Sequence, residues 1–275
     1  MSASAPSEPL HVFMLSVSSG IGEHLALDYL RRGARVVGTY RTQLPASLRD
    51  HARFSAIRSD VSVPADARRI AAFLETENFR WDLFISCVGQ LSPVGKFFEC
   101  DFEAWAESAE TNSVAQLRAL HAAHPFRRTG QLCHVVFFAG GGTNNAFHAY
   151  SAYCLGKIAL IKMCELLDDE NPDLNVFIVG TGWVRTKIHQ QTLAAGDRAG
   201  ANYRKTRSFI DRAVSGTSHD DIAAIIRWGV ASGRAVAGGR NFSVVHDDWR
   251  NPGNRLAAAL QTDPSKFKLR RHGNT

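Results

Sequence analysis

His11-Val12-Phe13-Met14-Leu15 is a short apolar run that breaks into Ser16-Val17-Ser18-Ser19-Gly20-Ile21-Gly22, and a helical pattern follows over residues 25–30. This order predicts a strand, a tight turn and a helix. Glycines at such a turn let the backbone approach a pyrophosphate, whose charge then lies on the free N–H groups of the helix N-terminus. A second apolar run over residues 34–40 follows at the length of one βαβ unit, which favours a nucleotide site over an ordinary turn of small residues.

Apolar runs of strand length alternate with helical patterns along the rest of the chain. They predict an α/β fold: a Rossmann-type, doubly wound parallel sheet of about seven strands, flanked by helices, in a single domain. The expected strands are Val12–Leu15, Val36–Tyr40, Phe54–Arg58, Leu83–Cys87, Cys133–Phe138, Asn175–Val179 and Asn241–Val245. Helices are expected to start at Val63-Pro64 and behind Thr217-Ser218. We expect residues 1–10 to be disordered, the domain to span 11–250, and a tail to cover 251–275.

Composition narrows the function. Of 275 residues, 45% are hydrophobic, enough to fill the core of one large sheet. Neither a long apolar stretch nor a signal sequence is present, so we expect a cytoplasmic protein without a membrane partner. The five cysteines lack paired metal spacing, and we expect no metal site. The net charge of +6 is scattered, without interleaved aromatic residues, so nucleic-acid binding is not expected.

A Tyr-x-x-x-Lys pair, Tyr153 and Lys157, lies in a predicted helix. Four-residue spacing places both side chains on one helical face. A cation there favours the phenolate, which makes a tyrosine with a reference pKa of about 10 useful for proton transfer near neutrality. The spacing alone is also typical of a plain helix with a half-buried ring and a solvated amine.

Together these features resemble the short-chain dehydrogenase/reductase family, from about His11 to Trp249. The family's glycine motif aligns with residues 15–22, with Ser16 in place of the first glycine. Asp60-Val61 matches the pair that contacts adenine, and residues 181–186 match the segment beside the nicotinamide. The resemblance assigns catalysis to Asn112, Tyr153 and Lys157. It implies a cofactor site made of Ser16, Ser18, Ser19, Gly20, Ile21, Gly22, Asp60, Val61, Cys87, Val88, Gly89, Tyr153, Lys157, Gly182, Val184 and Thr186.

Two departures from the family pattern stand out. The usual Asn-Asn-Ala-Gly after the fourth strand is Ser86-Cys87-Val88-Gly89, and Gly140 stands where the family places its catalytic serine. Losing one donor to a developing oxyanion typically costs roughly 100- to 1000-fold in rate. Thr143, on the glycine-rich loop that follows, is our hypothetical substitute and a fourth catalytic candidate. It is explained equally well as a turn former.

The end of the second strand bears on cofactor choice. Members that prefer NAD have Asp there, whereas this chain has Tyr40 followed by Arg41. Without a carboxylate there is no repulsion against a 2′-phosphate, and a guanidinium can bind that phosphate with two hydrogen bonds. We therefore expect Tyr40 and Arg41 to favour NADP(H) over NAD(H). The alternative is that Arg41 only caps the strand end in solvent.

Residues 187–216 correspond to the family's substrate lid. A basic cluster there (Arg198, Arg204, Lys205, Arg207) suits either a polar or anionic substrate or a solvated surface. The resemblance also implies a homodimer or homotetramer. The segment His246–Arg250 indicates either a subunit contact or a pocket wall.

The sequence as a whole predicts an NADP(H)-dependent oxidoreductase that interconverts a carbonyl and a secondary alcohol by hydride transfer. Tyr153 would be the general acid and base, Lys157 would lower its pKa and hold the ribose, and Asn112 would place a water. The competing interpretation is a catalytically degenerate dinucleotide-binding protein with a sensing or assembly role, which Ser16 and Gly140 favour.

Overall fold

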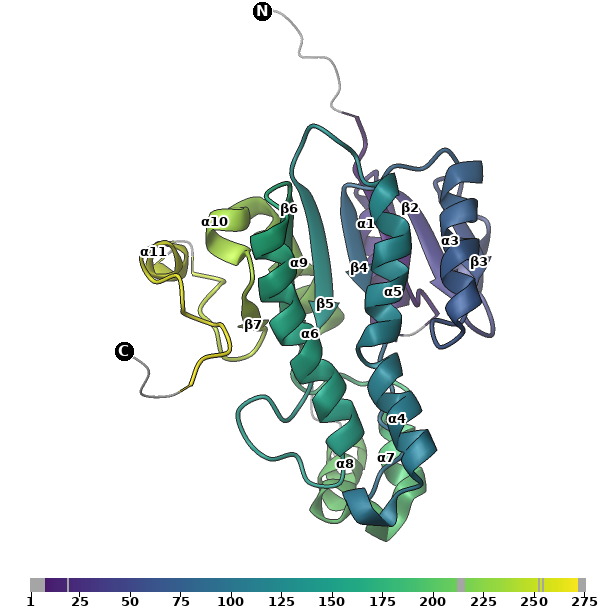
Figure 1. The fold of residues 1–275 in the computed structure, drawn as a ribbon, viewed down its shortest axis with the longest axis vertical. Coiled ribbons are helices and arrows are strands. Elements are labelled where there is room, and N and C mark those ends of the chain that lie inside the picture. Colours follow the sequence, from purple (N-terminus) through teal and green to yellow (C-terminus); the bar gives the residue numbers. More distant parts are fainter. Residues whose placement is uncertain (1–7, 19, 212–215, 252, 254, 272–275) are drawn as a thin grey trace, which may run out of the picture.

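The computed structural model describes residues 8–18, 20–211, 216–251, 253 and 255–271. It contains one parallel sheet of seven strands in the order β3-β2-β1-β4-β5-β6-β7 (Figure 1). The strands are β1 (His11–Leu15), β2 (Arg35–Tyr40), β3 (Phe54–Arg58), β4 (Leu83–Ser86), β5 (Cys133–Phe138), β6 (Leu174–Gly180) and β7 (Asn241–Ser243). The predicted doubly wound parallel sheet is confirmed.

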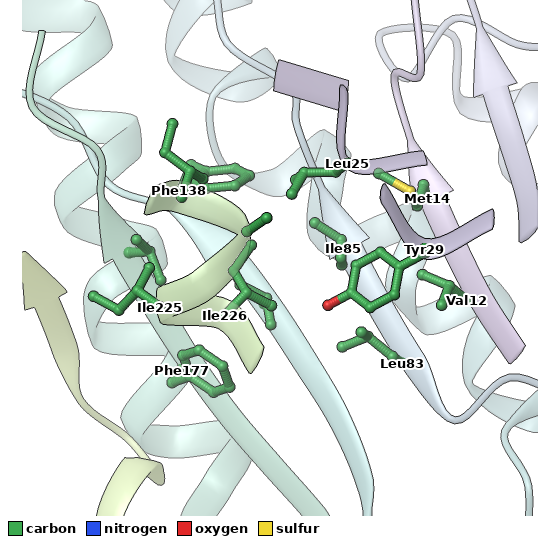
Figure 2. Packing of buried hydrophobic residues seen from close by; sticks show 14 of the residues in the cluster. Val12, Met14, Leu25, Tyr29, Leu83, Ile85, Phe138, Phe177, Ile225 and Ile226 are labelled. Atoms are coloured by element: carbon green, nitrogen blue, oxygen red, sulfur yellow. The ribbon is translucent and has the colours of Figure 1, made fainter. Parts of the chain in front are cut away.

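Helices cover both faces of this sheet. One layer contains α1 (Gly20–Arg31) and α9 (His219–Ser232), and the other contains α3 (Pro64–Thr76), α5 (Val114–Ala123) and α6 (Ser151–Glu170). Strand side chains alternate between the faces, so Val12 and Met14 of β1 point to the first layer while Phe13 and Leu15 point to the second. Figure 2 shows the first of these cores, to which α1 contributes Leu25 and Tyr29 and α9 contributes Ile225 and Ile226.

The remaining helices extend the fold at one end and one edge. Helices α4 (Phe102–Thr111), α7 (His189–Ala195) and α8 (Ala201–Asp211) lie together at the lower end in Figure 1. Helices α10 (Arg234–Ala237) and α11 (Arg255–Thr262) lie beside β7, while the short α2 (Ala46–Arg49) precedes β3. Arg240 fastens the α11 region to β7, because its guanidinium donates to the carbonyl oxygens of Leu260 and Lys266. Within the described residues, no helix is long and apolar enough to cross a membrane.

Strand order positions the site. Successive strands are added toward one edge of the sheet from β1 to β3 and toward the other edge from β4 to β7. Ligands of open parallel sheets bind outside the carboxyl ends of the strands where this order reverses, which is here between β1 and β4. The turns that follow β1 and β4 therefore meet there, as the glycine turn after Leu15 requires.

Candidate active site

A cavity of about 1210 Å³ opens at the carboxyl ends of the strands. Its wall brings together most of the residues that the sequence predicted for the site: Ser16, Ser18, Gly20, Ile21, Arg41, Asp60, Val61, Cys87, Val88, Gly89, Thr143, Tyr153, Lys157, Gly182, Val184 and Thr186. Gly22, Tyr40 and Asn112 lie behind the wall. Ser19 is outside the described residues. No group of three or more potential metal ligands gathers within the described part of the chain.

The turn between β1 and α1 is unusually tight. Ser16, which replaces the family's first glycine, has φ +66°, a left-handed conformation that favours glycine. Its amide donates to Thr39 Oγ1 at 3.0 Å, so β2 fixes the turn from the side. Gly22 packs so closely that a Cβ there would overlap the Ser16 carbonyl oxygen. Gly22 therefore serves helix–strand packing and has no direct contact with the cavity.

The ends of β2 and β3 place two arginines side by side. Parallel register pairs Tyr40 with Arg58, and the Arg58 Nε donates to the Arg41 carbonyl oxygen at 3.1 Å. Both guanidinium groups are exposed and have no ion-pair partner among the described residues. Tyr40 itself packs against the hydrophobic core on the α1 side. The cationic pair is therefore Arg41 and Arg58. Sequence analysis missed Arg58, which the register of β2 and β3 would have predicted.

Asn112 lies in the break between α4 and α5, fully buried. Its Nδ2 donates to the carbonyl oxygens of Gln90 (2.7 Å) and Ser108 (2.9 Å), and its Oδ1 accepts from the Gln90 amide at 3.0 Å. The side chain thereby holds the loop that follows β4.

Helix α6 carries Tyr153 and Lys157 into the cavity wall. Lys157 Nζ donates to the Val88 carbonyl oxygen at 3.0 Å and lies 5.9 Å from the centre of the Tyr153 ring. Burial lowers the pKa of Lys157 to about 8. Burial also raises the pKa of the Tyr153 phenol, which keeps the phenol protonated at neutral pH. The Tyr153 hydroxyl has no hydrogen-bond partner within the described residues, so it is available to a ligand.

Gly140 is in direct contact with that phenol. A Cβ added at Gly140 would overlap the Tyr153 hydroxyl and ring. The tyrosine thus fills space that a serine side chain would need. Nearby Thr143 donates its hydroxyl to the Gly140 carbonyl oxygen at 3.3 Å.

A family model described as Enoyl-(Acyl carrier protein) reductase matches residues 16–235. The chain belongs to the short-chain dehydrogenase/reductase family. The relatives that match include proteins named as oxidoreductases and as short-chain dehydrogenase/reductases.

Individual members of the family show how distant the relationship is. Short-chain dehydrogenase/reductase cdmF of Talaromyces verruculosus is 27% identical over 155 residues, 55% of this chain and 60% of that protein. The 11-beta-hydroxysteroid dehydrogenase-like 4A of Arabidopsis thaliana is 30% identical over 186 residues, 63% of this chain and 60% of that protein. The matches therefore span about 60% of the length of these two curated relatives.

Solved structures extend the likeness of fold. A short-chain dehydrogenase/reductase from Saccharomyces cerevisiae has a TM-score of 0.76 at 19% identity, covering 94% of this chain and 100% of that one. An ElxO variant with NADPH bound has a TM-score of 0.70 at 17% identity, covering 86% of this chain and 97% of that one.

The cavity of this short-chain dehydrogenase/reductase fits a dinucleotide. Gly20 and Gly89 expose backbone to it, and a Cβ on either would have no neighbour closer than 3.6 Å, so a phosphate can approach the main chain. The Asp60 carboxylate is held at the far end by the Ser62 amide (3.0 Å) and hydroxyl (2.8 Å). Ser18, Thr186 and Lys157 would complete the contacts with such a ligand.

Tyr153 is covered by part of residues 187–216, the segment that the resemblance predicted as a substrate lid without predicting its contacts. Gln191 of α7 accepts hydrogen bonds from the backbone amides of Leu91 (2.6 Å) and Ser92 (3.0 Å), and Thr192 bonds the Tyr150 hydroxyl at 2.8 Å. Ala195 and Ala199 pack into the same small hydrophobic cluster as Tyr153. Residues 187–211 are therefore docked over Tyr153. The contact between Gln191 and Leu91 joins positions about 100 residues apart, so no local sequence pattern could predict it.

Proposed function

We propose that this chain is an NADP(H)-dependent oxidoreductase that interconverts a carbonyl and a secondary alcohol, with Tyr153 as the general acid and base. The observation that carries the proposal is the unpartnered Tyr153 hydroxyl in the cavity wall, one helical turn from a buried lysine. When bound, the nicotinamide supplies the hydride.

The two α6 side chains divide the proton chemistry. Tyr153 donates its proton to the nascent alkoxide. Burial raises the pKa of the phenol, so it is still protonated when the alkoxide forms. Lys157, with a pKa of about 8, is mostly cationic at pH 7 and stabilises the phenolate that remains. It would also hold the nicotinamide ribose. That Asn112 places a water here stays a prediction, since its side-chain amide already binds Gln90 and Ser108.

Replacing Tyr153 tests the assignment. Tyr153→Phe keeps the ring and removes the proton, so turnover should fall by at least about 100-fold while cofactor affinity stays within a few fold. Tyr150→Phe is the matched control, because that hydroxyl is occupied by Thr192. Retained turnover in Tyr153→Phe, with loss in Tyr150→Phe, would move the proton to Tyr150.

Preference for NADPH is supported by two adjacent cations, Arg41 and Arg58. A charge-assisted phosphate contact contributes about 1.5–3 kcal/mol, which is tenfold or more in affinity. Arg41→Ala should therefore weaken NADPH and leave NADH unchanged, with Arg58→Ala acting in the same direction. Arg49→Ala, at an exposed arginine that donates to the Leu44 carbonyl oxygen, is the control. Equal affinities of the unmutated protein for NADPH and NADH would reject the preference.

We keep Thr143 as the proposed substitute for the missing serine. Its hydroxyl already reaches Gly140, beside the Tyr153 ring, and rotation about one bond would direct it to the cavity. Thr143→Val should then lower turnover without loss of folding. Unchanged turnover would leave Tyr153 as the sole donor to the carbonyl.

A degenerate dinucleotide-binding protein is the second candidate. The absence of a serine at position 140 favours it, because the site then lacks one donor to a carbonyl oxygen. A panel of carbonyls and alcohols with NADPH- or NADP-linked absorbance decides between the two functions, since a binder titrates with NADPH yet turns over none of the panel.

Assembly and location follow as further proposals. Phe102 of α4 and Leu155 of α6 are 60% and 52% exposed on two helices that pack together, a surface suited to a homodimer or homotetramer. All five cysteines are free, which suits a reducing, cytoplasmic compartment. Sedimentation of Phe102→Ser and Leu155→Ser variants should show smaller assemblies than the unmutated chain.

A further inference from the structure

The lid carries an excess of positive charge. The lid (residues 187–211) and the four residues before it together contain six cationic side chains and two carboxylates, Asp197 and Asp211. The six cations, all exposed, are Arg185, Lys187, Arg198, Arg204, Lys205 and Arg207. A surface of one sign beside a cleft raises the local concentration of ligands of the opposite sign.

These cations differ from most others in how they are paired. In the body of the protein, arginines such as Arg127, Arg227 and Arg234 form ion pairs with carboxylates. On the lid, Arg207 has a distant partner in Asp211 at 3.5 Å, and Arg185 donates to backbone carbonyls of α8. The other four have no ion pair within the described part of the chain. Their positive charge is therefore available to an anionic ligand.

The position of Lys187 connects this charge with the site. Lys187 lines the cavity, as do its neighbours in sequence, Thr186 and Ile188. Ile188 packs against the cluster that contains Tyr150 and Tyr153. Arg198 likewise precedes Ala199, which is fully buried in that cluster. One face of the lid therefore covers the catalytic tyrosine while its outer face and rim are cationic.

Part of the cavity wall near Tyr153 is apolar, where Leu91, Phe147 and Ile188 gather, while polar side chains such as Thr143, Gln191 and Thr192 line the rest. Of the three carboxylates in the wall, Asp60 and Asp247 accept hydrogen bonds from nearby backbone amides. The third, Glu107 of α4, is exposed. A partly apolar cavity with a cationic rim suits a ligand that has an anionic end.

We propose that the substrate of this site carries a carboxylate or phosphate group, that Lys187 binds this group, and that the other unpaired lid cations draw it in. The inference rests on the proposed function. A charge-assisted contact that is made equally in the ground and transition states changes binding and leaves the chemical step alone. The effect should therefore appear in Kd and KM.

Matched probes test this proposal. Straight-chain methyl ketones that end in a carboxylate, with short, medium and long spacers, are compared with their methyl esters for binding to the protein–NADPH complex and for NADPH-linked turnover. We expect at least one acid to bind about tenfold more tightly than its ester. Lys187→Gln should remove that difference by raising Kd and KM for the acid with kcat unchanged. Added salt should also weaken acid binding selectively.

Two further variants sharpen the outcome. Arg198→Gln/Arg204→Gln/Lys205→Gln should slow association of the acid, whereas Arg68→Gln, an exposed cation on α3 without an ion pair in the described chain, should not. Equal Kd values for every acid and ester, or equal effects of Lys187→Gln on both, would overturn the anionic substrate whether or not turnover is found. A preference for the acid in Kd without any turnover would support the anion site and refute the proposed enzyme.

Discussion

The two ends of the cavity depart from the family pattern in opposite ways. At the nucleotide end a serine, Ser16, replaces a glycine, and the backbone keeps the left-handed conformation that glycine would adopt. At the proposed catalytic end, Gly140 stands where the resemblance predicts a serine, and the neighbouring tyrosine fills the space. A larger residue in a constrained turn stores strain and leaves the path of the chain intact. A smaller residue in a packed wall leaves room for a neighbouring side chain, here that of Tyr153.

The largest effect should come from restoring the serine. If Tyr153 is the proton donor as proposed, Gly140→Ser should lower turnover by about 100-fold or more, because the new Cβ displaces the Tyr153 phenol. Gly141→Ala is the control, since its Cβ would meet only the Phe147 ring, at 3.2 Å. The measurement is steady-state turnover together with a melting curve for each variant. A rise in turnover on Gly140→Ser would mean that the tyrosine moves aside, and that the two ends tolerate change equally.

Next in size is the stability of the catalytic end. Burial lowers the pKa of Lys157 in the folded protein to about 8, from the 10.5 of a solvated lysine, so between these pH values the unfolded chain binds more protons. Stability should therefore rise with pH across this window. Lys157→Met removes the buried ammonium and should raise the free energy of unfolding by about 3 kcal/mol at pH 7. Urea unfolding should show this gain fading as pH rises from 8 to 10.5, and a gain independent of pH would exclude charge burial as its cause.

A third change tests packing at the nucleotide end. Gly22→Ala should cost about 1–3 kcal/mol of stability, because the added methyl group overlaps a backbone carbonyl that cannot rotate away. Gly20→Ala in the same turn has contacts no closer than 3.7 Å and serves as the control. Thermal unfolding of the two variants compares them directly. Similar losses in the two variants would show that the overlap at Gly22 does not set the cost, because the higher helix propensity of Ala over Gly would by itself stabilise both.

The smallest expected effect concerns the strain itself. Ser16→Gly should raise stability by about 0.5–1 kcal/mol, since glycine adopts positive φ without the steric penalty. Denaturant midpoints measure it. A loss of stability would show that the contacts of the serine side chain outweigh its backbone strain, and the nucleotide end would then be adapted to serine.

Sequence alone predicted the sheet well and the site in part. Apolar runs marked all seven strands within two residues at each end, because burial on both faces of a parallel sheet leaves a continuous apolar pattern. Strand β7 was predicted to end at Val245 but ends at Ser243, because the Ser243 amide donates to the Asp247 carboxylate and the chain turns there. Motif spacing gathered Tyr153 and Lys157 with the glycine turn in one cavity wall.

The residues that sequence reasoning missed depend on contacts between distant segments. Arg58 reaches Arg41 only through the register of β2 and β3, and Gln191 reaches Leu91 only after the lid has docked. The contact between Gly140 and Tyr153 needs side-chain positions, which no spacing rule supplies.

The loop at residues 90–92 is gripped from two sides. Asn112 holds the backbone of Gln90 from the break between α4 and α5, and Gln191 holds the amides of Leu91 and Ser92 from the lid. If α7 moved away from this loop, the Leu91 and Ser92 amides would lose the Gln191 oxygen that they share as acceptor and would need water in its place. Opening of the proposed lid would therefore also hydrate the loop next to Gly89.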